Sequence, residues 1–153
     1  MPIVEALAAE QVVQVRELFA EYWESFGFTP CFQNFAAELA ALPGEYAPPW
    51  GRLALALSDG LAAGCVGLRR LDRSRGELKR LYVRPAVRGC GWGRQLLAWA
   101  IAEARAIGYQ ELLCDTMPAM ADALAMYRRA GFEFTKPYTD NPTDGAIFLR
   151  LEL

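Results

Sequence analysis

The sequence predicts an α/β fold of about seven strands and four helices, in a single domain spanning residues 1–153. Three observations support this prediction. Residues 76–108 are typical of a strand, a glycine-rich turn and a long amphipathic helix. Residues 52–83 hold strand-like runs separated by short turns, and residues 111–153 alternate between strand-like and helix-like runs. No repeat or linker divides the chain, so we expect one domain.

The first third of the chain is predicted to be mostly helical. Residues 2–6 favour a short strand. Residues 10–26 favour a helix, because apolar side chains recur at helical spacing there, and the Gly-Phe-Thr-Pro stretch at 27–30 ends it. A second helix is expected at 33–42, followed by a Pro-Gly pair and a loop.

Three strands joined by tight turns are predicted next. Residues 52–57 and 62–71 flank an Asp-Gly turn of the kind that closes a hairpin. A second turn at 72–76 leads into a strand at 77–83. Pro85 ends strand pairing, since proline has no N–H to donate.

The glycine-rich turn after this strand predicts an anion site. Arg88, Gly91 and Gly93 form the pattern Arg-x-x-Gly-x-Gly, and the helix that follows ends at Gly108. Glycines let the backbone approach a ligand, and the free N–H groups at the helix N-terminus point at it. The spacing fits neither the dinucleotide fingerprint G-x-G-x-x-G nor a P-loop.

The last third is predicted to add a strand, a helix and two more strands. Residues 111–115 favour a short buried strand. Pro118 suits the first turn of a helix that ends at Gly131. Residues 132–138 and 146–153 are expected to form a final strand pair.

The glycine motif and its surroundings resemble the acetyl-CoA pyrophosphate loop of the GNAT superfamily of N-acetyltransferases. Leu-Tyr-Val-Arg-Pro precedes it and Leu-Leu follows it. A second stretch, residues 123–132, is similar to the family's next helix, with a tyrosine near its end and then Gly-Phe. The resemblance covers residues 52–135 and is looser before them. It implies a mixed, mostly antiparallel sheet, split between the fourth and fifth strands, with CoA in the split.

The resemblance also implies which residues bind acetyl-CoA. Backbone amides of the loop would hold the pyrophosphate, and the amide of Val83 would stabilise the thioester oxyanion. The alternative is that the glycines only turn the chain into the helix. The predicted cofactor-binding residues are Leu81, Tyr82, Val83, Arg88, Gly89, Cys90, Gly91, Trp92, Gly93 and Arg94.

Two catalytic residues follow from the resemblance. Tyr127 would protonate the leaving thiolate, or else be a core tyrosine. Glu77 would act as general base, directly or through water, because only a neutral amine attacks a thioester. Its alternative is a strand-end ion pair with Lys79 or an arginine. Strand alternation places Glu77, Lys79, Leu81 and Val83 on one face.

The acceptor is predicted to be a primary amine, on a small molecule or a peptide. The first 51 residues hold seven glutamates and one basic residue, which favours a cationic amine, unless these glutamates are simply solvated. Asp115 and Thr116 either touch the substrate or cap the next helix. The predicted substrate-binding residues are Tyr22, Phe32, Gln33, Thr116, Tyr138 and Asn141.

The predicted reaction is direct attack of the amine on acetyl-CoA in a ternary complex. Two alternatives stay open: transfer of another acyl group from CoA, and a CoA-binding module without catalysis.

Composition narrows the remaining classes. A net charge of −2 argues against general nucleic-acid binding, and no apolar run is long enough to span a membrane. The chain has no histidine and four scattered cysteines, which argues against a metal site and excludes Ser-His-Asp catalysis. With no signal peptide apparent, a cytoplasmic protein is expected, and a homodimer is compatible with the sequence.

Overall fold

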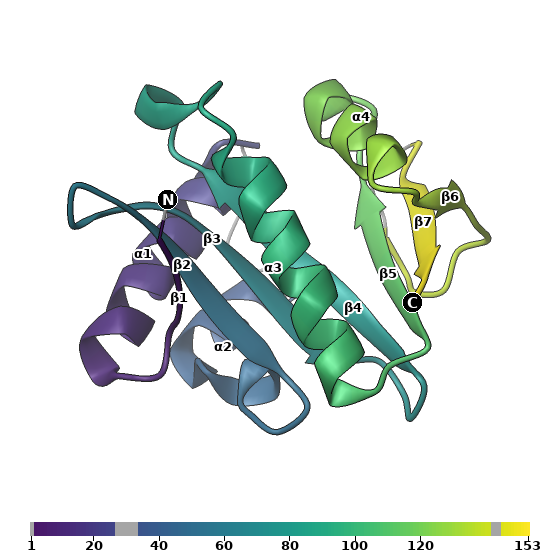
Figure 1. The fold of residues 1–153 in the computed structure, drawn as a ribbon, viewed down its shortest axis with the longest axis horizontal. Coiled ribbons are helices and arrows are strands. Elements are labelled where there is room, and N and C mark those ends of the chain that lie inside the picture. The colour runs from purple at the N-terminus through teal and green to yellow at the C-terminus, as the bar shows by residue number, and fades with distance from the viewer. Residues whose placement is uncertain (1, 27–33, 142–144) are drawn as a thin grey trace.

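A computed structural model gives the structure of the protein and describes residues 2–26, 34–141 and 145–153. Its elements follow the predicted order (Figure 1). Along the chain they are β1 (Ile3–Glu5), α1 (Ala9–Glu24), α2 (Phe35–Ala41), the short 3-10 helix η2 (Gly44–Tyr46), β2 (Arg52–Ser58), β3 (Leu61–Arg70), β4 (Arg75–Val83), the short 3-10 helix η3 (Pro85–Val87), α3 (Trp92–Ile107), β5 (Glu111–Thr116), α4 (Ala121–Arg129), β6 (Glu133–Phe134) and β7 (Ile147–Glu152).

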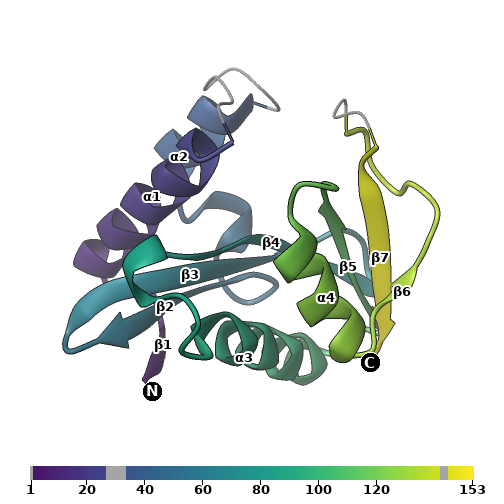
Figure 2. The ribbon, with the colours of Figure 1, turned by 90° about the horizontal axis from the view of Figure 1, so that it is seen from above.

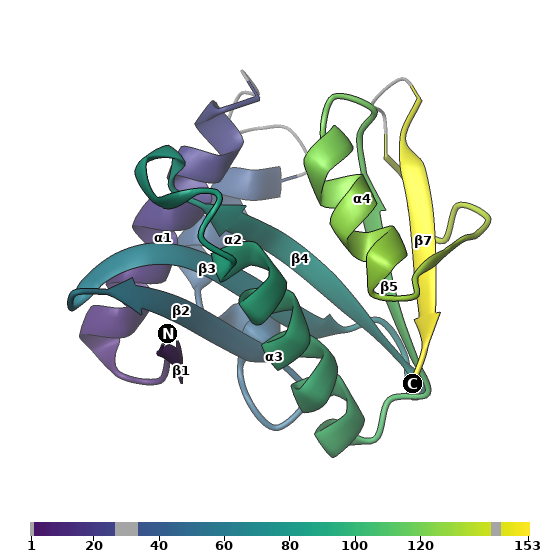
Figure 3. The same cartoon turned by 45° about the horizontal axis from the view of Figure 1, so that its top comes forward.

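The seven strands form one sheet in the order β1-β2-β3-β4-β5-β7-β6. Neighbouring strands are antiparallel except β4 and β5, which are parallel. These two strands pair only where Arg75–Glu77 meets Glu111–Leu113, and then diverge, as Figure 3 shows. The predicted split between the fourth and fifth strands is therefore confirmed.

Helices cover both faces of the sheet (Figure 2). On one face, α3 packs through small and branched residues such as Leu97, Ala100 and Ala104, together with residues of α4. On the other face, α1 packs through Val15 and Phe19. The helical spacing of apolar residues in both helices predicted these buried sides. The helices on the two faces are thus fixed to the same sheet that contains the split.

A β-bulge in β4 changes which side chains share a face. Between the pairs Cys65–Tyr82 and Gly67–Lys79, β4 has one residue more than β3. Arg80 takes up this extra residue with a positive φ of 59°. Leu81 consequently packs with the α3 cluster, while Glu77 contacts Arg69 and Tyr138 on the opposite side. The prediction that Glu77, Lys79, Leu81 and Val83 share one face was wrong, because the bulge interrupts the alternation.

Two element boundaries also differ from the prediction. Helix α4 begins at Ala121 rather than at Pro118, because a turn closed by the 2.9 Å bond from Met120 N to Met117 O comes first. Strand β6 covers only Glu133–Phe134 of the predicted 132–138. Both its side chains are exposed, so it lacks a buried apolar face that would sustain a longer strand.

Candidate active site

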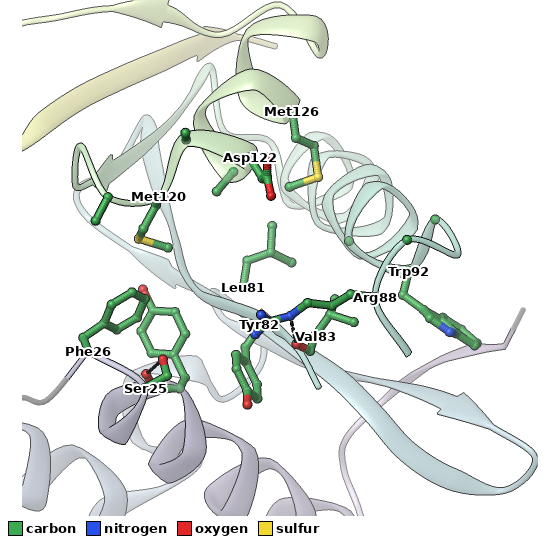
Figure 4. A pocket seen from close by; sticks show the side chains of 17 residues that line it. Ser25, Phe26, Leu81, Tyr82, Val83, Arg88, Trp92, Met120, Asp122 and Met126 are labelled. Atoms are coloured by element: carbon green, nitrogen blue, oxygen red, sulfur yellow. Dashed lines mark hydrogen bonds between the residues drawn. The ribbon is translucent and has the colours of Figure 1, made fainter. Parts of the chain in front are cut away.

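A cavity of about 630 Å³ opens where the strand β4 ends. Figure 4 shows Met120, Asp122 and Met126 on one side of it, and Tyr82, Val83 and Arg88 on the other. The C-terminal end of α1 and the N-terminus of α3 complete the wall. Four elements distant in sequence thus converge on one opening of the split.

The glycine-rich loop forms the α3 side of this cavity. Gly91 caps α3 with φ 91°, and Gly89 has φ 81°. Both conformations are ones that side chains with a Cβ rarely adopt. The first turn of α3 therefore presents its unpaired backbone N–H groups beside the cavity, as an anion site requires.

The structure brings eight of the ten predicted cofactor-binding residues to the wall of this cavity, namely Leu81, Tyr82, Val83, Arg88, Gly89, Gly91, Trp92 and Gly93. Cys90 and Arg94 do not line it. Cys90 is exposed, and the Arg94 guanidinium lies 3.7 Å from the position a Cβ on Gly91 would take. Both side chains are exposed to solvent.

Ion pairs neutralise part of the predicted charge asymmetry. Arg84 binds Glu21 at 2.7 Å, Arg80 binds Glu38 at 3.0 Å and Arg69 binds Glu45 at 2.9 Å. These glutamates of the first 51 residues are therefore structural partners of arginines. The preference for a cationic acceptor then depends on the remaining glutamates and stays a prediction. The Arg88 side chain lies beside the glycine-rich loop, where its Nε donates a hydrogen bond to Val83 O at 2.9 Å (Figure 4).

A second, much smaller cavity of about 20 Å³ lies deeper in the split. Tyr127 of α4 lines it, although its side chain is almost fully buried and its ring packs 5.5 Å from that of Phe132. Burial raises the pKa of the Tyr127 phenol well above its usual value, so the phenol keeps its proton at neutral pH. Tyr127 is thus both a core residue and a wall of the split.

Glu77 is fully buried and lines neither of these two cavities. Its Oε1 accepts a 2.8 Å bond from Arg69 Nε, and its Oε2 accepts a 2.7 Å bond from the Tyr138 hydroxyl. Lys79 Nζ lies 3.8 Å from the same Oε2. Both carboxylate oxygens therefore already serve as acceptors, in an ion-pair arrangement like the alternative weighed from the sequence.

Asp115 and Lys79 are two further polar residues of the split. The sequence offered Asp115 as a substrate contact or helix cap, and Lys79 as an ion-pair partner of Glu77. Asp115 Oδ2 accepts a 3.0 Å bond from Asn141, and its Oδ1 lies 3.6 Å from Lys79 Nζ. Both residues line the smaller cavity. Asp115 does not cap α4, whose N-cap residue is Met120. Asp115 lies in the split because β4 and β5 pair only as far as Leu113, and no local sequence pattern indicates its contact with Lys79.

The predicted substrate residues are only partly brought together. Tyr22 lines both cavities, and burial raises its pKa to about 12. The Tyr138 hydroxyl donates a hydrogen bond to Glu77 of β4, and Asn141 Nδ2 donates one to Asp115 of β5. The Thr116 hydroxyl instead contacts Met120 Sδ at 3.3 Å. Phe32 and Gln33 lie outside the described residues.

Among the described residues, no group of histidine, cysteine or carboxylate side chains is arranged to hold a metal ion. No helix in that part of the chain has the length and apolar character to cross a membrane.

Comparisons with known proteins agree with this geometry. Residues 12–132 match the model of the acetyltransferase (GNAT) family. An uncharacterised N-acetyltransferase of Schizosaccharomyces pombe is 36% identical over 138 residues, covering 89% of this chain and 85% of that protein. An acetyltransferase structure from Streptococcus agalactiae has a TM-score of 0.83 at 19% identity, covering 99% of this chain and 98% of its own. A GNAT-family structure from Elizabethkingia anophelis with acetyl-CoA bound has a TM-score of 0.67 at 21% identity, covering 99% of this chain and 97% of its own.

Proposed function

Because the chain belongs to the acetyltransferase (GNAT) family, we propose that it transfers the acetyl group of acetyl-CoA to a primary amine. The amine attacks directly, in a complex that holds both substrates. The observation that carries this proposal is the glycine loop at the N-terminus of α3, which borders a cavity of about 630 Å³ at the mouth of the split.

The loop fits the pyrophosphate of CoA. Gly89 and Gly91 leave the amides uncovered, and the α3 N-terminus carries the positive end of the helix dipole. A Cβ on Gly93 would lie 3.4 Å from Met126 Sδ, so this glycine keeps the wall between α3 and α4 narrow. Arg88 and Arg94 supply positive charge nearby. The pantetheine arm would then follow Leu81–Val83 into the split.

When bound, acetyl-CoA supplies the acetyl group and a thiolate leaving group. Tyr127 is assigned as the proton donor to that thiolate, because its phenol is protonated and faces the smaller cavity. The acceptor enters from the side of α1, past Tyr22, Tyr138 and Asn141. The contacts of Glu77 support a positioning role, in which it fixes Tyr138 over the split. Its predicted role as general base stays a prediction.

The test of cofactor binding is Gly91→Asp. The added carboxylate would repel a phosphate at the helix N-terminus, so we expect the rise in melting temperature with acetyl-CoA to disappear. Gly60→Asp is the matched control, because Gly60 also has a positive φ, of 78°, and open space around its Cβ position. The control reports the backbone strain alone, about 1–2 kcal/mol. Undiminished binding in Gly91→Asp would contradict the assignment.

A thiol-release assay with acetyl-, propionyl- and succinyl-CoA against a panel of amines separates the alternatives. Faster transfer of another acyl group would show that the donor is a different acyl-CoA. Tight binding of acetyl-CoA without transfer to any amine would favour the non-catalytic module.

A further inference from the structure

Four groups capable of proton transfer border the smaller cavity of the split, one of them the Tyr22 phenol. The other three are the Lys79 ammonium, the Asp115 carboxylate and the Tyr127 phenol. A volume of about 20 Å³ exceeds the roughly 10–15 Å³ that one water-sized probe needs. The cavity therefore has room for a single small polar group, such as the nitrogen of an amine.

One oxygen of Asp115 is available to that group. Oδ2 accepts the 3.0 Å bond from Asn141 Nδ2, which fixes the rotation of the carboxylate. Within the described residues Oδ1 accepts no hydrogen bond and faces the Lys79 ammonium at 3.6 Å. The Asp115 side chain is 10% exposed and lines the cavity, so it is held in place at the cavity wall.

Glu77 differs from Asp115 in each of these respects. Its side chain has no exposed surface, and both its oxygens accept hydrogen bonds of 2.7–2.8 Å. Protonating Glu77 would weaken its bonds with Arg69 and Tyr138, leaving buried polar groups poorly paired. Protonating Asp115 at Oδ1 would leave its bond with Asn141 intact.

We propose that Asp115, rather than Glu77, accepts the proton of the acceptor amine, and that Lys79 is the positioning residue for its carboxylate. This assignment rests on the proposed function. Asp115 touches the reacting nitrogen, and Lys79 acts through Asp115 by compensating its charge from the neighbouring strand.

The proton balance is complete with the residues present. Asp115 Oδ1 takes one proton from the ammonium form of the acceptor, and the neutral nitrogen then forms the C–N bond as the C–S bond breaks. Tyr127 gives its phenol proton to the departing sulfur. The phenolate takes the second proton from the nitrogen of the product. The proton on Asp115 passes to water when the acetylated product leaves.

Charged and titratable groups face Asp115 from every element packed against it. Burial raises the pKa of each facing tyrosine, so these phenols stay neutral over the working range of pH. The charged groups that face Asp115 are then Lys79, Arg80 and Glu77, all on β4. The facing groups are Lys79, Arg80 and Glu77 of β4, Tyr22 of α1, Tyr127 of α4, and Tyr138 after β6.

The test is the pH profile of kcat/KM for Asp115→Asn, measured with the fastest amine among spermidine, lysine, tyramine and ethanolamine. We expect a loss of about 100-fold near pH 7, typical of a lost general base. The loss should shrink as pH rises towards the amine pKa of about 10, because free amine no longer needs a base. Lys79→Met is expected to move the acidic limb of the profile to higher pH. Acetyl-CoA should still raise the melting temperature of Asp115→Asn as in wild type.

Two variants serve as controls. Glu111→Gln removes another paired carboxylate of the same strand, at its closed end, and should leave the profile unchanged. Glu77→Gln should lower the rate by a factor that does not vary with pH. A wild-type profile for Asp115→Asn, or pH-dependent rescue in Glu77→Gln instead, would overturn the assignment. Wild-type protein that binds acetyl-CoA yet acetylates no amine would overturn the proposed function itself.

Discussion

At the scale of single residues, Tyr127 combines two roles that are often weighed as alternatives. It is buried among the α3-face cluster and also borders the split. Burial raises its pKa well above that of a free tyrosine, so it remains a proton donor even in mildly alkaline solution.

The prediction for Tyr127→Phe follows from these two roles. The ring packing is retained and the proton donor is lost, so kcat should fall by about 100-fold while acetyl-CoA binding stays within about twofold. Stopped-flow or steady-state thiol release checks the first quantity, and calorimetry the second. Tyr109→Phe is the control, since it removes the 2.6 Å bond to Trp50 O at the closed end of the sheet. An unaltered kcat in Tyr127→Phe would identify Tyr127 as packing alone.

The sequence could predict Tyr127 and the glycine loop because short patterns carry both. It could not predict the pairing of Asp115 with Lys79 and Asn141. Lys79 and Asn141 are 36 and 26 positions from Asp115, respectively, and meet it only once β4, β5 and the segment after β6 converge. Their side-chain directions depend on that convergence, which no local pattern records.

At the scale of elements, the bulge in β4 is joined to α2 by a buried ion pair. Arg80 Nε and Nη2 bind both oxygens of Glu38, at 3.0 and 3.2 Å. The guanidinium also lies 4.9 Å from the Trp23 ring and 5.2 Å from the Phe35 ring. Helix α2 thereby holds the backbone of Arg80 in its left-handed conformation.

Glu38→Gln should therefore be costly. It leaves a guanidinium that is 6% exposed without its carboxylate, for which a loss of about 3 kcal/mol is typical. Urea unfolding measures the change. Glu45→Gln is the matched control, because Glu45 binds Arg69 from a side chain that is 72% exposed and should cost under about 1 kcal/mol. Equal losses in the two variants would contradict this role of α2.

The order and type of the elements could be predicted from periodicity and turn residues. The bulge could not, because Arg80 is an ordinary residue for a strand and its positive φ comes from tertiary contacts. The early end of β6 could not be predicted either. Tyr138, which the predicted strand included, instead donates a hydrogen bond to Glu77.

At the scale of the whole molecule, buried phenols and thiols dominate the response to alkali. Burial raises the pKa of Tyr46, Tyr127 and Tyr138 above 10, and that of Cys65 and Cys114 above 9. In each case the native state binds its proton more tightly than the unfolded chain does. The stabilisation is therefore complete at neutral pH and is lost as pH rises past the unfolded pKa values.

The free energy of unfolding should accordingly be flat to about pH 8 and fall above about pH 9. Urea unfolding between pH 7 and pH 11 checks this. In Tyr46→Phe the decline should be shallower, because one such phenol is gone. Within the described residues the Tyr46 hydroxyl has no hydrogen-bond partner, so its removal should cost little at neutral pH. A decline as steep as in wild type would show that the pKa of Tyr46 is the same in the folded and unfolded states.

The two halves of the active site have separate origins in the fold. The cofactor loop belongs to the junction of β4 and α3, whereas Tyr138 and Asn141 reach the split from the segment after β6. Under the proposed function, substitutions in that segment would change which amine is admitted and would leave the loop for the acyl donor intact. A change of acceptor would then require neither a new fold nor a new donor site.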